Sequence, residues 1–292
     1  MKFLIILCLL PLFASGQKIY KGKIVNAKTK QNIPFATVGL MKANVGINAD
    51  ESGEFILSTT TENIRDTLII SCVGYETLKI ATTNVLEIIY LNEKQTDLSE
   101  VKVFSKINWT FTKLNNKDCC AEGFTTNGFQ SQIAKLFKTS FDNSILTEVE
   151  IYKSNSLFVR HKSLFRLRFY DMDTITKAPS TELCNEVIEI NTSNKCTKVN
   201  LEKYKIRVSN YFFVAIEWLK IEYNENIYTT RIEGKKLERK TYRPFILCNM
   251  NKQVTNVVMS EQNYAVWGLF YNNTWRPQPW ISDLSISVTI KN

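Results

Sequence analysis

The sequence predicts an all-β protein built from two β-sandwiches in series. Short runs with period-2 alternation of apolar and polar residues recur along the chain, separated by turn signals, and they do not alternate with helical patterns as in an α/β fold. A length of 292 residues accommodates two domains, and 44% hydrophobic with 22% charged residues is typical of a folded chain. We therefore expect a seven-stranded β-sandwich followed by a second sandwich of jelly-roll or Greek-key type.

Residues 1–16 have the composition of a secretory signal peptide. Lys2 precedes an apolar run too short to span a bilayer, and Ala14-Ser15-Gly16 provides small residues for cleavage. Cys8 lacks the small preceding residues of a lipobox, so we expect an unlipidated mature chain from Gln17. No later segment reaches 18 apolar residues, which predicts no transmembrane segment in the mature chain. The expected location is the periplasm, the outer-membrane surface or the extracellular space.

The first domain is predicted over residues 17–104. Residues 19–25 alternate as a half-buried strand, and Pro34 stands at the first position of the next strand, where proline is tolerated. Asp50-Glu51-Ser52-Gly53 is a turn signal with too few oxygen ligands for a calcium loop. Further strands are predicted at 45–47, 54–57, 66–72, 77–81, 86–91 and, leading out of the domain, 98–104.

Residues 105–128 are polar and turn-rich, which predicts a connecting segment, and residues 129–292 form the second domain. Residues 129–137 fit either a short helix or a strand. In the run 164–170, Phe165, Leu167 and Phe169 share one face of a strand, and Arg166, Arg168 and Tyr170 share the other. Further strands are predicted at 146–152, 186–190, 199–201, 211–218, 256–259 and 285–290.

Several short motifs in the first domain occur in a recognisable order. They are Gly22-Lys23-Ile24-Val25, Ile33-Pro34-Phe35-Ala36-Thr37-Val38, Gly46-Ile47-Asn48-Ala49-Asp50, Gly53-Glu54-Phe55, and Asp66–Ser71 with Val73-Gly74-Tyr75. This series resembles the carboxypeptidase-regulatory-like domain, a transthyretin-like β-sandwich of exported Bacteroidota envelope proteins. The resemblance implies a fold and an exported location. It does not imply peptidase activity, because in metallocarboxypeptidases a separate zinc domain carries the catalysis.

The second half is similar to an uncharacterised C-terminal region that accompanies the same domain in Bacteroidota proteins. This resemblance implies a domain layout and no known reaction. It is carried by Gly128-Phe129-Gln130 with Gln132-Ile133-Ala134, by 165–170, by Val199-Asn200-Leu201 with Tyr204, and by 211–218.

Six cysteines remain after removal of the signal peptide, and export makes disulfides feasible. Cys184 and Cys196 flank a predicted turn and could approach each other across a hairpin, although the register does not settle the pairing. Vicinal cysteines pair with each other only under strain. The connectivity among Cys72, Cys119, Cys120, Cys184, Cys196 and Cys248 stays open.

The net charge of +9 is unevenly distributed. Residues 17–104 carry ten basic and ten acidic residues, whereas the chain after Phe104 carries 26 basic and 18 acidic residues. The densest basic cluster follows Gly234, and we interpret it as an exposed hairpin turn, with a polyanion patch as the alternative. The cluster comprises Lys235, Lys236, Arg239, Lys240 and Arg243. No aromatic-interleaved motif for nucleic acid accompanies it.

No catalytic motif emerges from the sequence. The single histidine, His161, lies between Arg160 and Lys162, which excludes zinc sites with two imidazoles and points to a solvated turn. Neither a nucleophile elbow nor a glycine-rich phosphate loop occurs. The i, i+2 acid pairs Glu148/Glu150 and Asp171/Asp173 share strand faces, as a glycosidase would need, but such pairs are common on solvated strands. We predict no catalytic residues, no cofactor and no metal site.

An aromatic segment near the C-terminus supplies the candidate ligand-binding residues. Exposed aromatic rings stack on sugars, and the neighbouring Asn, Gln and Arg side chains could bind hydroxyl groups. The competing and favoured interpretation is that these rings fill the sandwich core. The candidates are Trp267, Tyr271, Trp275 and Trp280.

Together these patterns predict an exported, non-enzymatic envelope protein that acts as a binding or assembly module. Its expected partners are an envelope protein or a cell-surface glycan, and not nucleic acid. The alternatives are a glycan-binding protein, a degenerate hydrolase, and an accessory partner of a TonB-dependent transporter. Sequence alone does not define the oligomeric state.

Overall fold

The computed structural model describes residues 18–60, 65–95, 109–114, 122–126, 128–154, 162–232, 234–250 and 265–292. In these segments the chain forms β-strands and two short 3-10 helices, η1 (Glu202–Tyr204) and η2 (Glu222–Asn224). None of the helices found there has the length and apolar composition needed to cross a membrane. The all-β class predicted from the alternation pattern is therefore confirmed.

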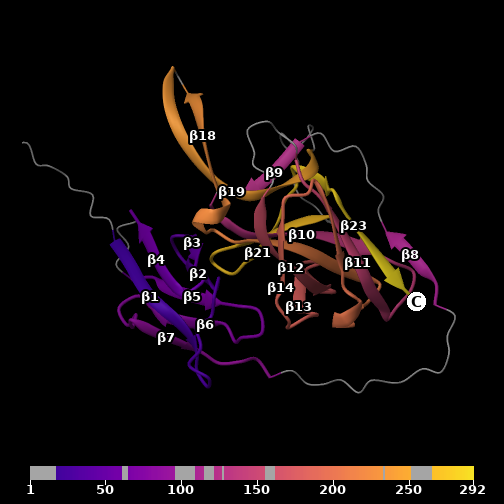
Figure 1. Ribbon diagram of the computed structural model, residues 1–292, viewed down its shortest axis with the longest axis horizontal. Coiled ribbons are helices and arrows are strands. Elements are labelled where there is room, and N and C mark those ends of the chain that lie inside the picture. The colour runs from indigo at the N-terminus through magenta and orange to yellow at the C-terminus, as the bar shows by residue number, and fades with distance from the viewer. Residues whose placement is uncertain are drawn as a thin grey trace, which may run out of the picture.

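The N-terminal sandwich contains seven strands in two sheets, as the turn spacing predicts (Figure 1). One sheet has the order β4-β1-β7 and the other has the order β3-β2-β5-β6. Strand β4 shows how the sequence builds the domain, because Phe55 and Leu57 point into the core while Glu54 and Ile56 point outward. The strands are β1 (Lys18–Asn26), β2 (Thr37–Leu40), β3 (Val45–Asn48), β4 (Glu54–Thr59), β5 (Thr67–Ser71), β6 (Leu78–Ala81) and β7 (Ile88–Leu91).

The C-terminal domain contains three sheets around a second core. Seven strands follow the path β13-β12-β17-β10-β20-β21 with β14 paired to β12, and five follow β15-β11-β23-β8 with β16 paired to β11. The remaining sheet has the order β18-β19-β22, with β9 paired to β19. The main core lies between the first two sheets, where Phe165, Leu167 and Phe169 of β12 are buried together with Val149 of β11 and Val288 of β23.

The bounds of the C-terminal strands agree closely with several predicted runs. The strand predicted at 211–218 has those same bounds, and the ambiguous segment 129–137 is a strand. The strands are β8 (Phe111–Leu114), β9 (Glu122–Thr126), β10 (Gln130–Lys138), β11 (Ser144–Tyr152), β12 (Ser163–Met172), β13 (Pro179–Glu182), β14 (Ile188–Thr192), β15 (Cys196–Asn200), β16 (Arg207–Val208), β17 (Tyr211–Trp218), β18 (Glu225–Ile232), β19 (Lys235–Met250), β20 (Val266–Phe270), β21 (Trp275–Pro277), β22 (Ile281–Leu284) and β23 (Ile286–Lys291).

The predicted connecting segment, residues 105–128, does more than connect the domains. Strand β8 pairs with β23 and β9 pairs with β19, so both belong to C-terminal sheets. Their polar composition concealed them, because β8 lies at a sheet edge and its residues are half-buried or exposed. The strands predicted at 98–104 and 256–259 lie outside the described residues.

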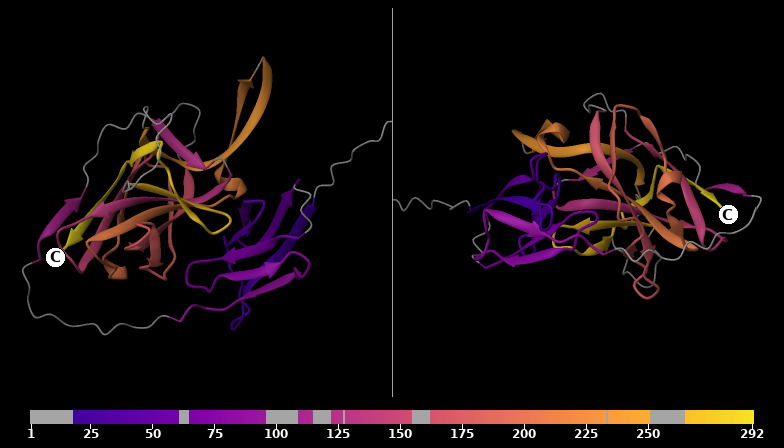
Figure 2. Two further views of the ribbon diagram at one scale, coloured as in Figure 1. Left: turned by 180° about the vertical axis from the view of Figure 1, so that it is seen from behind. Right: turned by 60° about the horizontal axis from the view of Figure 1, so that its bottom comes forward.

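The two domains are in direct contact. Phe35 of the N-terminal sandwich is buried together with Leu164 and Leu219 of the C-terminal domain, and Ile221 packs against them. Figures 1 and 2 show strands β1 to β7 grouped on one side of the molecule and the C-terminal sheets on the other. The β18–β19 hairpin projects beyond both domains.

Candidate functional site

A buried polar network holds the two domains together at one end of β12 and β17. These strands pair so that Arg166 lies opposite Glu217, and Arg168 Nη1 lies 3.0 Å from the Glu217 carboxylate. Thr37 of the N-terminal sandwich donates its hydroxyl to Glu217 at 3.2 Å. Because Glu217 is almost fully buried, this contact fixes the position of β2 relative to β17.

Arg166 forms the second polar link between the domains. Its guanidinium donates to the backbone carbonyls of Pro34 at 3.1 Å and Phe35 at 3.4 Å, and it pairs with Glu189 at 3.3 Å. Its Nη1 also lies 3.8 Å from the Sγ atom of Cys72, and burial raises the pKa of that thiol. Arg166 is therefore a structural residue, shielded from solvent by the N-terminal sandwich.

Tyr271 inserts into the N-terminal sandwich at two glycines. A Cβ atom at Gly46 would lie 2.0 Å from the Tyr271 ring, and one at Gly39 would lie 2.6 Å from the Tyr271 carbonyl oxygen. The missing side chains of these glycines create the space that Tyr271 fills. Burial raises the pKa of the Tyr271 phenol well above its ordinary value.

Lys220 completes the junction. Its backbone N–H donates to Asn48 Oδ1 at 2.8 Å, and its ammonium donates to the carbonyl of Gly46 and, at 3.3 Å, to that of Gly128. The ammonium also lies 4.9 Å from the centre of the Tyr271 ring. Burial lowers the pKa of Lys220 to about 8, with a smaller contribution from the positive charge of Lys240.

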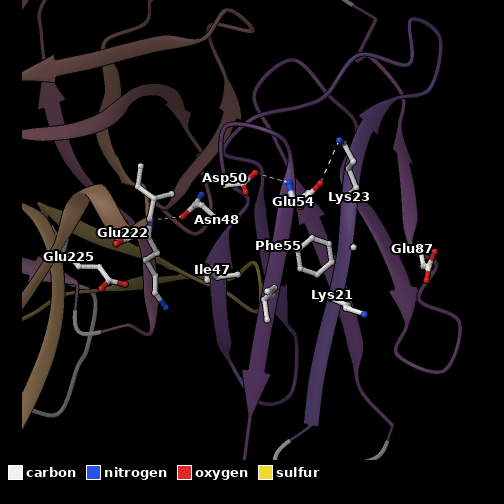
Figure 3. A pocket seen from close by; sticks show the side chains of 14 residues that line it. Lys21, Lys23, Ile47, Asn48, Asp50, Glu54, Phe55, Glu87, Glu222 and Glu225 are labelled. Atoms are coloured by element: carbon white, nitrogen blue, oxygen red, sulfur yellow. Dashed lines mark hydrogen bonds and ion pairs between the residues drawn. The ribbon is translucent and has the colours of Figure 1, made fainter.

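A cleft of about 670 Å³ lies beside these contacts, with walls from both domains (Figure 3). Strands β1, β3 and β4 supply one wall, and the segment 220–225 supplies the other. The lining residues are Lys21, Gly22, Lys23, Ile47, Asn48, Asp50, Glu54, Phe55, Ile56, Glu87, Lys220, Ile221, Glu222 and Glu225.

Most of the cleft's charged groups have structural roles. Asp50 accepts hydrogen bonds from Ser52 and from the Glu54 N–H, and these bonds stabilise the turn. Burial alone would raise the pKa of the Asp50 carboxyl, but the hydrogen bonds outweigh it and the pKa is lowered. Glu54 pairs with Lys23 at 3.6 Å, and Glu225 pairs with Lys240. Because most of these charges are already engaged within the protein, the cleft is better suited to a ligand that binds through complementary shape and apolar contacts.

An exposed apolar face continues outward from the cleft. In the β4-β1-β7 sheet, Ile56 lies opposite Lys21 and Ile88 lies alongside Lys23, so their side chains share the outer face. Ile56 is 66% exposed and Ile88 is 46% exposed. Ile19 and Tyr90 are exposed on the same face, and the exposed Leu86 lies just before β7 with its carbonyl close to Gly22 of β1. We call these five exposed apolar residues the outer apolar face.

Sequence reasoning did not identify this surface, although a signal for it was present. Strand β7 reads Ile-Ile-Tyr-Leu, and a strand with apolar residues at every position buries only half of them when one of its faces is open. Ile89 and Leu91 enter the core, which leaves Ile88 and Tyr90 outside.

The predicted aromatic segment does not form a single surface. Trp267 is buried beside Tyr170, and Trp275 is half-buried with its ring in edge contact with Tyr170 at 5.3 Å. Tyr271 is buried at the domain junction, and only Trp280, at 44%, is exposed. Trp267 and Tyr271 therefore pack the interior, Trp275 does so in part, and Trp280 faces solvent.

The predicted basic cluster is divided by the structure. Lys235, Lys236, Arg239 and Lys240 are exposed on the β18–β19 hairpin, and Gly234 has a φ of 79° at its turn. Arg243 does not share that surface. It is buried and donates to the backbone carbonyls of Asn224, Lys162 and Tyr223, because the chain has by then entered the domain.

The acid pairs have structural partners. Glu150 is buried and pairs with Lys113 and Lys198, each at 2.7 Å. Asp173 accepts hydrogen bonds within its own turn, and Asp171 accepts one from Ser209 at 2.6 Å. His161 lies outside the described residues. Among the described residues, no group of three or more His, Cys, Asp or Glu side chains is arranged to hold a metal ion.

The described cysteines, Cys72, Cys184, Cys196 and Cys248, are not joined to one another in disulfides. The hairpin that would have brought Cys184 towards Cys196 does not form, because β14 pairs with β12 whereas β15 pairs with β11 in another sheet. Cys119 and Cys120 lie outside the described residues.

The fold and this junction define a class: a two-domain all-β protein whose N-terminal sandwich docks on a larger C-terminal β domain. Residues 20–103 match the family model of the CarboxypepD_reg-like domain, so the N-terminal sandwich is a domain of that family. The resemblance found in the ordered motifs of this region is confirmed.

No curated protein matches the chain. Among solved structures, it is similar to the cysteine protease and lectin-like domains of Cwp84, a surface layer associated protein of Clostridium difficile. The identity is 8% and the TM-score 0.36, and the alignment covers 91% of this chain and 61% of that one. The chain thus spans less than two thirds of the length of that structure.

Proposed function

We propose that this chain is an exported, non-enzymatic envelope protein that binds a protein partner at the outer apolar face and the adjoining cleft. The signal-like residues 1–16 support export. The CarboxypepD_reg-like domain at residues 20–103 supports a binding or assembly role. The resemblance to metallocarboxypeptidases implies that catalysis there belongs to a separate zinc domain.

The observation that carries this proposal is the outer apolar face. A β-sheet with one face in the core and the other in solvent normally alternates apolar residues inside with polar residues outside. Here five large apolar side chains are each between 46% and 66% exposed, and one of them, Ile56, also lines the cleft. Exposed apolar side chains interspersed with polar ones occur at protein interaction sites, and covering these five would contribute several kcal/mol to association.

The geometry favours an extended segment of the partner. Within the described residues, β4 pairs with β1 along one edge only, and the cleft lies along its other side. A partner strand could add to this edge through backbone hydrogen bonds while its side chains contact Ile56 and Ile47. The charged residues at the edge of the cleft, most of which are paired within the protein, would then determine the register in which the partner strand binds.

The absence of catalysis is part of the proposal and has a direct test. The arginines and acids of the junction are engaged in holding the domains together, which is a structural use of their charge. We expect no turnover on a panel of peptides and glycans. Turnover that is lost in Asp171→Asn or Glu148→Gln would establish an enzyme instead.

Site-specific photo-cross-linking tests the binding surface. A photoreactive phenylalanine analogue at position 56 or 88 should yield adducts with a protein partner in envelope fractions. Position 175 is a matched control, because Ile175 is also a large apolar residue and is 88% exposed, but lies on the C-terminal domain. Equal adducts at position 175, or none at positions 56 and 88, would refute the assignment.

A further inference from the structure

The β18–β19 hairpin is a two-stranded arm with little support from the rest of the protein. Its strands pair from Glu225 opposite Tyr242 to Ile232 opposite Lys235. Along this length the described structure pairs β18 and the first part of β19 only with each other, so both outer edges are free. A long free strand edge is a template for pairing with another strand, and an isolated hairpin is only marginally stable in water.

The composition of β18 suits further pairing. The strand reads Glu-Asn-Ile-Tyr-Thr-Thr-Arg-Ile, which is rich in β-branched and aromatic residues. Ile227 is 61% exposed and Tyr228 is 42% exposed, so two large side chains on opposite faces of the arm are open to solvent.

Charge is distributed unevenly along the arm. Glu225 stands at its base, next to Glu222, whereas Arg231 stands near its tip, next to the turn that leads to Lys235 and Lys236. Glu225 and Arg231 are six positions apart on one strand, so their side chains lie on the same face. On this face of β18 a carboxylate therefore stands at the base and a guanidinium stands near the tip, and the carboxylate also pairs with Lys240 of its own chain.

We propose that two copies of this chain associate by antiparallel addition of β18 to β18 about a two-fold axis at Tyr228. In this register Arg231 of each copy lies opposite Glu225 of the other, and the two Tyr228 residues face each other. Shifting the axis by one residue moves Arg231 opposite Ile227 or Tyr223 and loses both charge pairs. Opposite charges across a strand pair stabilise it, and like charges destabilise it.

The antiparallel arrangement also separates the basic tips. Eight residues of strand span about 25 Å, so each tip lies beside the base of the other copy's arm rather than beside the other tip. The result is a four-stranded ribbon, β19-β18-β18-β19, in which both β18 strands are paired on two sides.

A second copy fits the arm better than a polyanion does. The register places Lys236 and Lys240 on one face of the arm and Lys235 and Arg239 on the other, so the basic groups do not form one surface. The free edge and the alignment of Glu225 with Arg231 point instead to strand pairing between copies.

Cysteine cross-linking tests the axis on the full chain without residues 1–16. Residues directly opposite in an antiparallel pair have Cα atoms about 4.5–5.5 Å apart, within the range of a disulfide. Tyr228→Cys should therefore yield a covalent dimer under mild oxidation, above the background that the native cysteines give in the unaltered chain. Asn226→Cys alone should not, although a mixture of Asn226→Cys and Thr230→Cys should, because residue 226 lies opposite residue 230.

Sedimentation equilibrium tests the charge pairs. Arg231→Glu should raise the dimer dissociation constant at least about tenfold, because two opposite-charge pairs become like-charge pairs. Exchanging the charges in Glu225→Arg/Arg231→Glu should restore association. Arg239→Glu, a matched change on the other strand and face of the arm, should leave association unchanged.

A chain that stays monomeric throughout the concentration series would overturn the proposal, as would Arg231→Glu dimerising as tightly as the unaltered chain. Glu225 also lines the cleft, so the two proposals are separated by Arg231→Glu, which changes no residue of the cleft or of the outer apolar face. Photo-cross-linking in the Arg231→Glu background removes adducts that arise from self-association, so either proposal can fail alone.

Discussion

Replacing Gly46 by alanine should weaken the docking of the two domains without damaging the N-terminal sandwich. The φ angle of Gly46 is not positive, so an alanine at this position can adopt the same backbone conformation. Alanine also loses less conformational entropy than glycine when a strand folds. The added methyl group would nevertheless lie 2.0 Å and 2.5 Å from carbon atoms of the Tyr271 ring. A ring at that distance must move.

The ring has little room to move. Tyr271 is buried, its carbonyl oxygen already lies close to Gly39, and Lys220 lies over its ring. Overpacking of this kind costs about 1–3 kcal/mol, and expelling the ring would forfeit a similar amount from its burial. In a chain of this size we expect the melting temperature to fall by roughly 2–4 °C for each kcal/mol lost.

A double-mutant cycle followed by thermal unfolding isolates this contact. Tyr271→Ala removes the obstacle, so Gly46→Ala/Tyr271→Ala should be no less stable than Tyr271→Ala alone. The reasoning is refuted if Gly46→Ala leaves the melting temperature unchanged, or if the two single effects add in the double variant.

Two further predictions concern the C-terminal domain. Burial alone would raise the pKa of Glu150, but hydrogen bonds from Lys113, Lys198 and Tyr152 outweigh it and hold the pKa at about 2, below the ordinary 4.5. The lowered folded-state pKa contributes stability that is present above about pH 4.5 and is lost as the pH falls towards 2, on the order of 3 kcal/mol. Chemical denaturation across this window should show the loss, and Glu150→Gln should flatten it; an unchanged pH slope in that variant would contradict the assignment. Trp275→Ala should destabilise the fold by about 2–3 kcal/mol through loss of its contact with Tyr170, whereas Trp280→Ala, at a more exposed site, should cost under about 1 kcal/mol in the same melting assay. Equal costs for the two tryptophans would show that the half-buried ring contributes no packing.

The sequence by itself determined the strands and the sides on which they are buried. Period-2 alternation placed Phe165, Leu167 and Phe169 on one face of β12, and all three are buried in the C-terminal core. The largely apolar run 211–218, interrupted by Glu217, became β17, whose residues are buried on both faces from Phe212 onward. Local patterns suffice here because strand geometry forces alternate residues onto opposite faces.

Tertiary structure decided what those faces meet. The alternation that separated Arg166 and Arg168 from the core residues did not show that a second domain would cover them, since Arg166 meets Phe35 across 131 positions of sequence. In the sequence, Tyr271 is one residue of an aromatic run. In the structure, it fills the space left by the missing side chains of Gly39 and Gly46, more than 200 positions away. The periodicity of the sequence indicates whether a strand face is buried or exposed. Which distant segments contact each other depends on complementary shape and charge, and these are brought together only when the chain folds.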